Sequence, residues 1–270
     1  MLRILTAALL LPVLWATIKL APPVVFSLVA LAAIGTAVWE CLGILGKGEG
    51  PPFKWLGLAA TLAVVWSFLD LAPRFDTRLP LALLVTFALI LAMWRRDEPR
   101  TMLQSALHTI FPVLFVGLSL AFLAGLRAMP GEDGEDLLML LFLCVILADI
   151  AAYYVGKNFG RRHMAPMLSP KKTWAGAIAG LTGSVLGALV IHIWIYQRLP
   201  LLHALVLGLV LGLAAILGDL AESMVKRSAG VKDSSGLLPG HGGLLDRTDS
   251  LLFAGPILFY YYQWFLGGGV

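Results

Sequence analysis

The sequence predicts an all-α fold: a polytopic integral membrane protein, built as a bundle of about nine transmembrane helices with a cytoplasmic N-terminus. Composition is the first observation behind this prediction. The 270 residues are 59% hydrophobic and 13% charged, whereas soluble domains are about 45–50% apolar and about 25% charged. The second is the recurrence of apolar runs along the chain, and the third is the uneven distribution of the lysines and arginines between those runs.

Apolar runs recur from one end of the chain to the other. A spanning helix needs about 20 mainly apolar residues. The fourth run is short, and Pro112 should kink the fifth because proline lacks a backbone N–H. The candidate spans are residues 3–20, 23–45, 54–71, 79–94, 103–126, 137–156, 173–197, 201–224 and 248–267.

The basic residues then set the orientation. With the N-terminus inside, fifteen lysines and arginines fall on the cytoplasmic side and five on the other. Cytoplasmic loops of membrane proteins carry an excess of these residues. This orientation places the loops at 157–172 and 225–247 in the cytoplasm and the C-terminus outside. Basic loops also account for the net charge of +4, so no nucleic-acid partner is expected.

The chain is predicted to form a single membrane-embedded domain over residues 1–270. Residues 1–135 would supply N-terminal helices as a scaffold on the lipid side. Residues 136–270 would supply the catalytic helices and the cytoplasmic loops. Cys41 and Cys144 both lie in apolar runs, so no disulfide framework is expected.

The most informative segment runs from Ser223 to Asp249, where charged and glycine residues separate two apolar runs. Asp219, just before it, lies one to two turns inside the end of a predicted helix, where a carboxylate is costly unless it is paired or binds a metal. Asp246 and Asp249 are three residues apart and share a helix face. Basic groups, carboxylates and a glycine turn at 239–243 are the parts of a metal–nucleotide site. The alternative is a charged loop that only caps two helices.

This segment resembles the signature of the phosphatidate cytidylyltransferase family, also called CDP-diacylglycerol synthases. The signature is a serine, Lys-Arg, Lys-Asp, a small residue, Pro or Gly, His-Gly-Gly and Asp-Arg-x-Asp, and it is matched without a gap. The nine-span layout and the C-terminal place of the signature are similar to the bacterial members. The matching residues are Ser223, Lys226, Arg227, Lys232, Asp233, Ser235, Pro239, His241, Gly242, Gly243, Asp246, Arg247 and Asp249.

A second segment, residues 149–176, leaves one predicted helix at Asp149 and enters the next after a basic loop. Ser169 or Thr173 can cap that helix, whose N-terminal dipole favours anions. With Lys171 and Lys172 beside it, the segment predicts a cradle for a triphosphate. It also resembles the family, whose members carry a Ser-Pro-x-Lys-Thr block here. The alternative is a basic loop that binds lipid headgroups.

The resemblance implies an enzyme that joins CTP to phosphatidic acid, giving CDP-diacylglycerol and pyrophosphate. It implies an inner-membrane protein of bacteria whose site faces the cytoplasm, with Mg²⁺ or Mn²⁺ as cofactor and room for a second cation. CTP, phosphatidic acid and membrane lipid are the implied partners, and a homodimer stays open. The predicted catalytic residues are Asp246, Asp219, Lys226, Arg227, Lys232, Arg247 and His241. The predicted substrate-binding residues are Ser223, Lys171, Lys172, Ser169, Thr173, Gly242 and Gly243. The predicted metal ligands are Asp219, Asp246, Asp249 and Asp149.

Two other functions are compatible with parts of the pattern. A CTP-dependent polyprenol or dolichol kinase has a signature of similar style, but its lipid hydroxyl needs a base. A cation transporter would use Asp149 and Asp219 as an ion path, which carboxylates at mid-bilayer would support.

Two further features favour structural roles. Gly176, Gly180, Gly183 and Gly187 form small-residue faces suited to close helix packing. Glu40 is expected to make an interhelical hydrogen bond rather than to act in catalysis.

Overall fold

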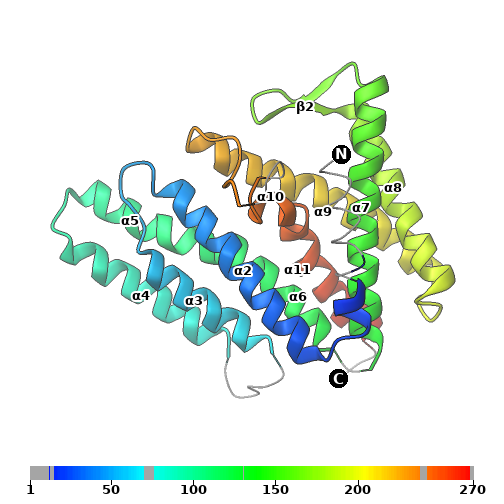
Figure 1. The fold of residues 1–270 in the computed structure, drawn as a ribbon, viewed down its shortest axis with the longest axis horizontal. Coiled ribbons are helices and arrows are strands. Elements are labelled where there is room, and N and C mark those ends of the chain that lie inside the picture. Colours follow the sequence, from blue (N-terminus) through cyan, green and yellow to red (C-terminus); the bar gives the residue numbers. More distant parts are fainter. Residues whose placement is uncertain (1–11, 13–14, 70–75, 130, 238–241, 268–270) are drawn as a thin grey trace. The chain divides into compact units, whose positions relative to one another are not determined.

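The computed structural model describes residues 12, 15–69, 76–129, 131–237 and 242–267. Its described elements are almost all helical, which confirms the predicted all-α membrane bundle (Figure 1). Five helices are long and apolar enough to cross a bilayer, and three more are apolar but shorter. The count of nine spans stays a prediction, since most of the first predicted span (residues 3–20) lies outside the described residues.

The helices follow the predicted order closely. Six of the predicted spans correspond to single α-helices: α2 (Pro23–Leu45), α3 (Lys54–Ser67), α4 (Arg78–Trp94), α7 (Asp133–Phe159), α8 (Trp174–Trp194) and α9 (Leu201–Ser228). The predicted fifth span consists of α5 (Pro99–Pro112), the π-helical segment η1 (Val113–Leu118) and α6 (Ser119–Arg127). The predicted ninth corresponds to α11 (Leu251–Tyr261) and the π-helical η2 (Tyr262–Leu266), after the short α10 (Leu245–Thr248).

The chain divides into two compact units. Unit 1 contains residues 1–128 and 226–248, and unit 2 contains residues 129–225 and 249–270. The boundaries therefore fall inside α9, between Val225 and Lys226, and again between Thr248 and Asp249. The signature segment is therefore divided between the two units. Its basic residues and Asp246 belong to unit 1, and Asp249 belongs to unit 2.

Unit 1 is a helical bundle of α2 to α6, with α10 packed against α2. The helix that contains Pro112 continues beyond it through the π-helical segment η1. A proline removes one backbone hydrogen bond, and a π-helical turn is one way in which a helix accommodates such a disruption. In η1, a Cβ added at Gly117 would lie 3.2 Å from the Thr61 side chain of α3, so glycine allows these two helices to approach closely.

Unit 2 is organised by the packing of α7 against α8. The predicted small-residue face is confirmed. A Cβ added at Gly183 would lie 2.5 Å from the Leu147 carbonyl of α7, and one at Gly187 would lie 3.0 Å from the Leu143 carbonyl. The backbones therefore meet with no side chain between them, as in close helix pairs of membrane proteins.

A small β-hairpin joins α7 to α8, where the sequence suggested only a basic loop. Strand β1 (His163–Ala165) pairs antiparallel with β2 (Ser169–Thr173). Ser169 pairs with Ala165, and Thr173 pairs with His163. The hairpin was difficult to predict because β2 reads SPKKT, which contains a proline and two lysines.

Candidate active site

Unit 2 contains a cavity of about 630 Å³. It lies between the C-terminal half of α7, the β-hairpin, the first turn of α8 and the part of α9 around Asp219. Its lining combines four basic side chains with two carboxylates. The basic residues are Lys157, His163, Lys171 and Lys172, and the acidic residues are Asp149 and Asp219. A cavity with this lining can hold an anion and a cation side by side.

The hairpin places both predicted lysines at the cavity, because β2 carries Lys171 and Lys172 immediately before α8. Lys172 Nζ lies 2.6 Å from Asp219 Oδ2, and both side chains are partly exposed. Thr173 is the N-cap of α8, and its hydroxyl accepts a hydrogen bond of 3.2 Å from the Gly176 backbone N–H. The predicted cap is therefore confirmed at Thr173.

Three carboxylates lie close together beside the C-terminal half of α9. Asp219, Glu222 and Asp249 each offer a carboxylate oxygen, and these atoms all lie within 4.8 Å of one another. Asp219 and Glu222 are three residues apart and share one face of α9. Asp249 can approach because Gly218 has no side chain, since a Cβ there would lie 2.5 Å from the Asp249 carbonyl oxygen.

This cluster fits a hard divalent cation. Mg²⁺ and Mn²⁺ prefer carboxylate oxygens and keep some positions for water and phosphate. Three carboxylates so close together repel one another unless positive charge neutralises them, and Glu222 has no exposed surface. Asp219 is also part of the cavity lining, so a cation held here would border the cavity.

Two of the four predicted metal ligands, Asp219 and Asp249, belong to the cluster, together with Glu222, which the sequence did not single out as a ligand. Asp149 is exposed and lines the cavity instead. Asp246 belongs to unit 1, so its predicted pairing with Asp219 stays a prediction. The signal for Glu222 was its position three residues after Asp219 on one helix.

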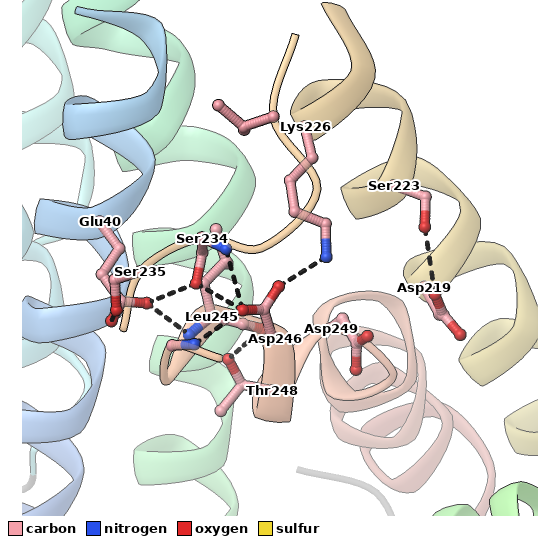
Figure 2. A network of polar contacts seen from close by, with 12 residues as sticks. Glu40, Asp219, Ser223, Lys226, Ser234, Ser235, Leu245, Asp246, Thr248 and Asp249 are labelled. Carbon is pink, nitrogen blue, oxygen red and sulfur yellow. Dashed lines mark hydrogen bonds and ion pairs between the residues drawn. The ribbon is translucent and has the colours of Figure 1, made fainter. Parts of the chain in front are cut away.

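In unit 1, Asp246 is the centre of a second polar network (Figure 2). Lys226 Nζ lies 2.5 Å from Asp246 Oδ1. Asp246 Oδ2 accepts hydrogen bonds from the Ser234 N–H at 2.9 Å and the Gly243 N–H at 2.7 Å. Burial alone would raise the pKa of the Asp246 carboxyl. The hydrogen bond from Lys226, the two backbone N–H groups and the charge of Lys226 outweigh burial and lower that pKa to about 2.

The two glycines of the signature allow carboxylates to approach the backbone closely. Gly242 has φ +78°, and a Cβ there would collide with the Asp246 carboxylate. A Cβ at Gly243 would collide with Ser234 Oγ and with the carboxylate of Glu40. The sequence predicted that these glycines bring backbone to a phosphate. That prediction remains untested. In the structure, the glycines make room for the side chains of Asp246, Ser234 and Glu40.

The other predicted residues are placed as follows. Ser223 Oγ lies 3.4 Å from Asp219 Oδ1 in unit 2, and Ser169 begins β2. Arg227 donates a hydrogen bond of 3.1 Å to the Val231 carbonyl in unit 1. Lys232 and Arg247, also in unit 1, are exposed. His241 lies outside the described residues.

Comparison with known proteins gives a consistent result. Residues 1–265 match the profile of the cytidylyltransferase family. A phosphatidate cytidylyltransferase of Pseudomonas aeruginosa is 36% identical over 270 residues, which cover 94% of each chain. One from Haemophilus influenzae is 37% identical over 195 residues, 68% of this chain and 64% of its own. One from Synechocystis sp. is 48% identical over 127 residues, 46% of this chain and 42% of its own. The matched region thus spans less than two thirds of the latter two proteins.

Proposed function

Because the chain belongs to the cytidylyltransferase family, we propose that it transfers the cytidylyl group of CTP to phosphatidic acid. The products are CDP-diacylglycerol, a precursor for phospholipid synthesis, and pyrophosphate. One observation in the structure carries the proposal. Lys171, Lys172 and Asp219 line the same cavity, and Asp219 also belongs to the cluster of three carboxylates. A polyphosphate with a bound cation needs this combination of groups.

In the proposed reaction, an oxygen of the lipid phosphate attacks the α-phosphorus of CTP. A new P–O bond forms, the bond between the α-phosphorus and the bridging oxygen to the β-phosphorus breaks, and pyrophosphate leaves. The lipid phosphate is a monoester with a second pKa of about 6, so it is largely ionised at neutral pH and needs no general base. The chain therefore has to position the phosphates and stabilise their charge.

The residues of unit 2 divide this work. Lys171 and Lys172 would hold phosphate oxygens by charge-assisted hydrogen bonds, and Lys157 and His163 extend the same basic lining. Asp219, Glu222 and Asp249 would hold a divalent cation, Mg²⁺ or Mn²⁺. When bound, such a cation supplies a Lewis acid that neutralises charge on the triphosphate and on the leaving pyrophosphate.

The proposed location is the inner membrane of bacteria, with the site open to the cytoplasm. One substrate is a bilayer lipid and the other a soluble polyanion. Fifteen of the twenty lysines and arginines fall on the side of the 157–172 and 225–247 loops, which supports this orientation.

Radiolabelled CTP tests the proposal with purified protein, phosphatidic acid and Mg²⁺ in lipid micelles. Label at the α-phosphorus should enter the lipid fraction, and pyrophosphate should be released in equal amount. Label at the γ-phosphorus should stay in the aqueous phase. Transfer of γ-label to a polyprenol, with release of CDP, would replace the proposal by a lipid kinase.

A further inference from the structure

We propose that Glu40, a residue of α2, is a positioning residue for the signature segment of unit 1. The inference rests on the proposed cytidylyl transfer, and it assigns Glu40 no contact with a reacting atom. Its role is to hold Ser234, Ser235, Leu244 and Leu245 in place, and through them Asp246 and its ion pair with Lys226.

The burial of Glu40 requires an explanation. Its side chain is 7% exposed, and Val38, Cys41 and Leu42, its neighbours in α2, have no exposed surface. A carboxylate in such surroundings costs several kcal/mol unless strong hydrogen bonds replace its water. Thr36, one turn before Glu40 in α2, donates its hydroxyl to the Ala32 carbonyl instead, and the hydrogen bonds of Glu40 come from another part of the chain.

Four donors from the signature segment provide this compensation (Figure 2). Glu40 Oε1 accepts from the Ser235 hydroxyl at 2.6 Å and from the Leu244 N–H at 3.1 Å. Glu40 Oε2 accepts from the Ser234 hydroxyl at 2.9 Å and from the Leu245 N–H at 2.9 Å. Two donors come before residues 238–241 and two come after them. One carboxylate therefore joins both branches of the segment to α2.

The same contacts link Glu40 to Asp246. Ser234 Oγ lies 2.9 Å from Glu40 Oε2 and 2.9 Å from Asp246 Oδ2. A hydroxyl has one hydrogen, so the two carboxylates compete for it, while the Ser234 N–H also donates to Asp246. Moving Ser234 would therefore disturb the acceptor side of Asp246. Ser234 therefore connects Glu40 of α2 to Asp246 through hydrogen bonds.

Gly243 provides a separate observation for the same arrangement. A side chain at this position would collide with Glu40 and with Ser234. The backbone is thus packed directly on the Glu40 carboxylate, which leaves no room for water between them. A site built this tightly is expected to respond to the loss of two hydrogen bonds.

Glu40→Gln is the variant that tests the proposal. Glutamine keeps the shape but has one acceptor oxygen, and its NH₂ group would face two donors. We expect kcat to fall at least tenfold, with KM for CTP changed less than threefold. Peptides covering 231–250 should exchange backbone hydrogen at least tenfold faster, while those of α3 to α5 stay as in the wild type. Glu98→Gln, at an exposed position of the same unit, is the matched control. It should leave kcat, KM for CTP and the exchange of the 231–250 peptides unchanged.

Ser235→Ala is the second variant, because it removes one donor from a partly exposed position and leaves α2 intact. Combined with Glu40→Gln it should be no slower than Glu40→Gln alone, since both changes break one unit. A Glu40→Gln protein within twofold of the wild-type rate would overturn the proposal. So would faster exchange spread evenly over α2 to α5, which would mean a general packing role. If the wild type transferred no cytidylyl group, the exchange measurement would still decide whether Glu40 holds the segment.

Discussion

Lys172 and Asp219 form an ion pair of 2.6 Å between strand β2 and helix α9. The pair connects the basic lining of the cavity with the carboxylate cluster of unit 2, because Lys172 lines the cavity and Asp219 is one of the three clustered carboxylates. The ammonium group occupies a position beside Asp219 that a metal ion would also favour. In the proposed reaction, Lys172 would exchange this contact with Asp219 for a contact with a phosphate of CTP.

Replacing Lys172 by alanine should have two effects of opposite sign. KM for CTP should rise at least tenfold, because a phosphate contact is lost. The Mg²⁺ concentration that gives half-maximal activity should fall, because Asp219 no longer has a competing ammonium. Lys171→Ala is the matched control: its KM for CTP should also rise, but its Mg²⁺ requirement should stay the same. An unchanged KM for CTP in both variants would leave the segment as a lipid-headgroup site.

Glu222→Gln should weaken the proposed cation site while it stabilises the metal-free protein. The variant keeps the size of the side chain and removes one of the three clustered carboxylates. We expect the half-maximal Mg²⁺ or Mn²⁺ concentration to rise at least tenfold, and the melting temperature in chelator to rise by a few degrees because repulsion is reduced.

The control for Glu222 is Glu132→Gln, an exposed residue of unit 2 that pairs with Arg198. It should leave the cation requirement unchanged. A Glu222→Gln protein with wild-type Mg²⁺ dependence and a lower melting temperature in chelator would show that the cluster is structural.

The sequence could predict a large part of unit 2 from local patterns. Asp219 shortly precedes the signature segment, Asp249 is its last residue, and Thr173 precedes an apolar run as the N-cap of a helix does. Glu222 was harder, because a carboxylate near the cytoplasmic end of a helix is common and needs no ligand. The contacts of Glu40 could not be predicted from spacing, since Ser234 is 194 positions away and the pairing depends on how α2 and the segment pack in space.

The lowered pKa of Asp246 gives a prediction about pH. The folded-state value of about 2 is below the ordinary value of 3.8, so the carboxylate contributes stability that is complete above about pH 5. That contribution, about 2 kcal/mol by linkage, should be lost as the pH falls through 4 towards 2. The melting temperature of the wild type should exceed that of Asp246→Asn by a constant amount from pH 5 to 8, and the difference should shrink below pH 4. A difference that already shrinks between pH 7 and 5 would contradict the assignment.

Gly243→Ala should disrupt the signature segment through a single methyl group. The new Cβ would overlap Ser234 Oγ and the Glu40 carboxylate, and both are held by hydrogen bonds, so neither can move cheaply. We expect a loss of about 1–3 kcal/mol in stability and a fall in kcat of at least tenfold. Gly236→Ala is the matched control, because a Cβ there has no atom within 4 Å, and it should behave like the wild type.

The origin of the Gly243→Ala defect can be tested in a second background. Ser234→Ala removes the hydroxyl that the new methyl group would meet, at the cost of its hydrogen bonds to Glu40 and Asp246. If overlap with this hydroxyl causes much of the defect, Gly243→Ala should lower the melting temperature less in the Ser234→Ala protein than in the wild type. The two single changes would then be less than additive. Full additivity in melting temperature and in kcat would mean that the methyl group acts elsewhere, for example by blocking a phosphate that approaches the Gly243 backbone.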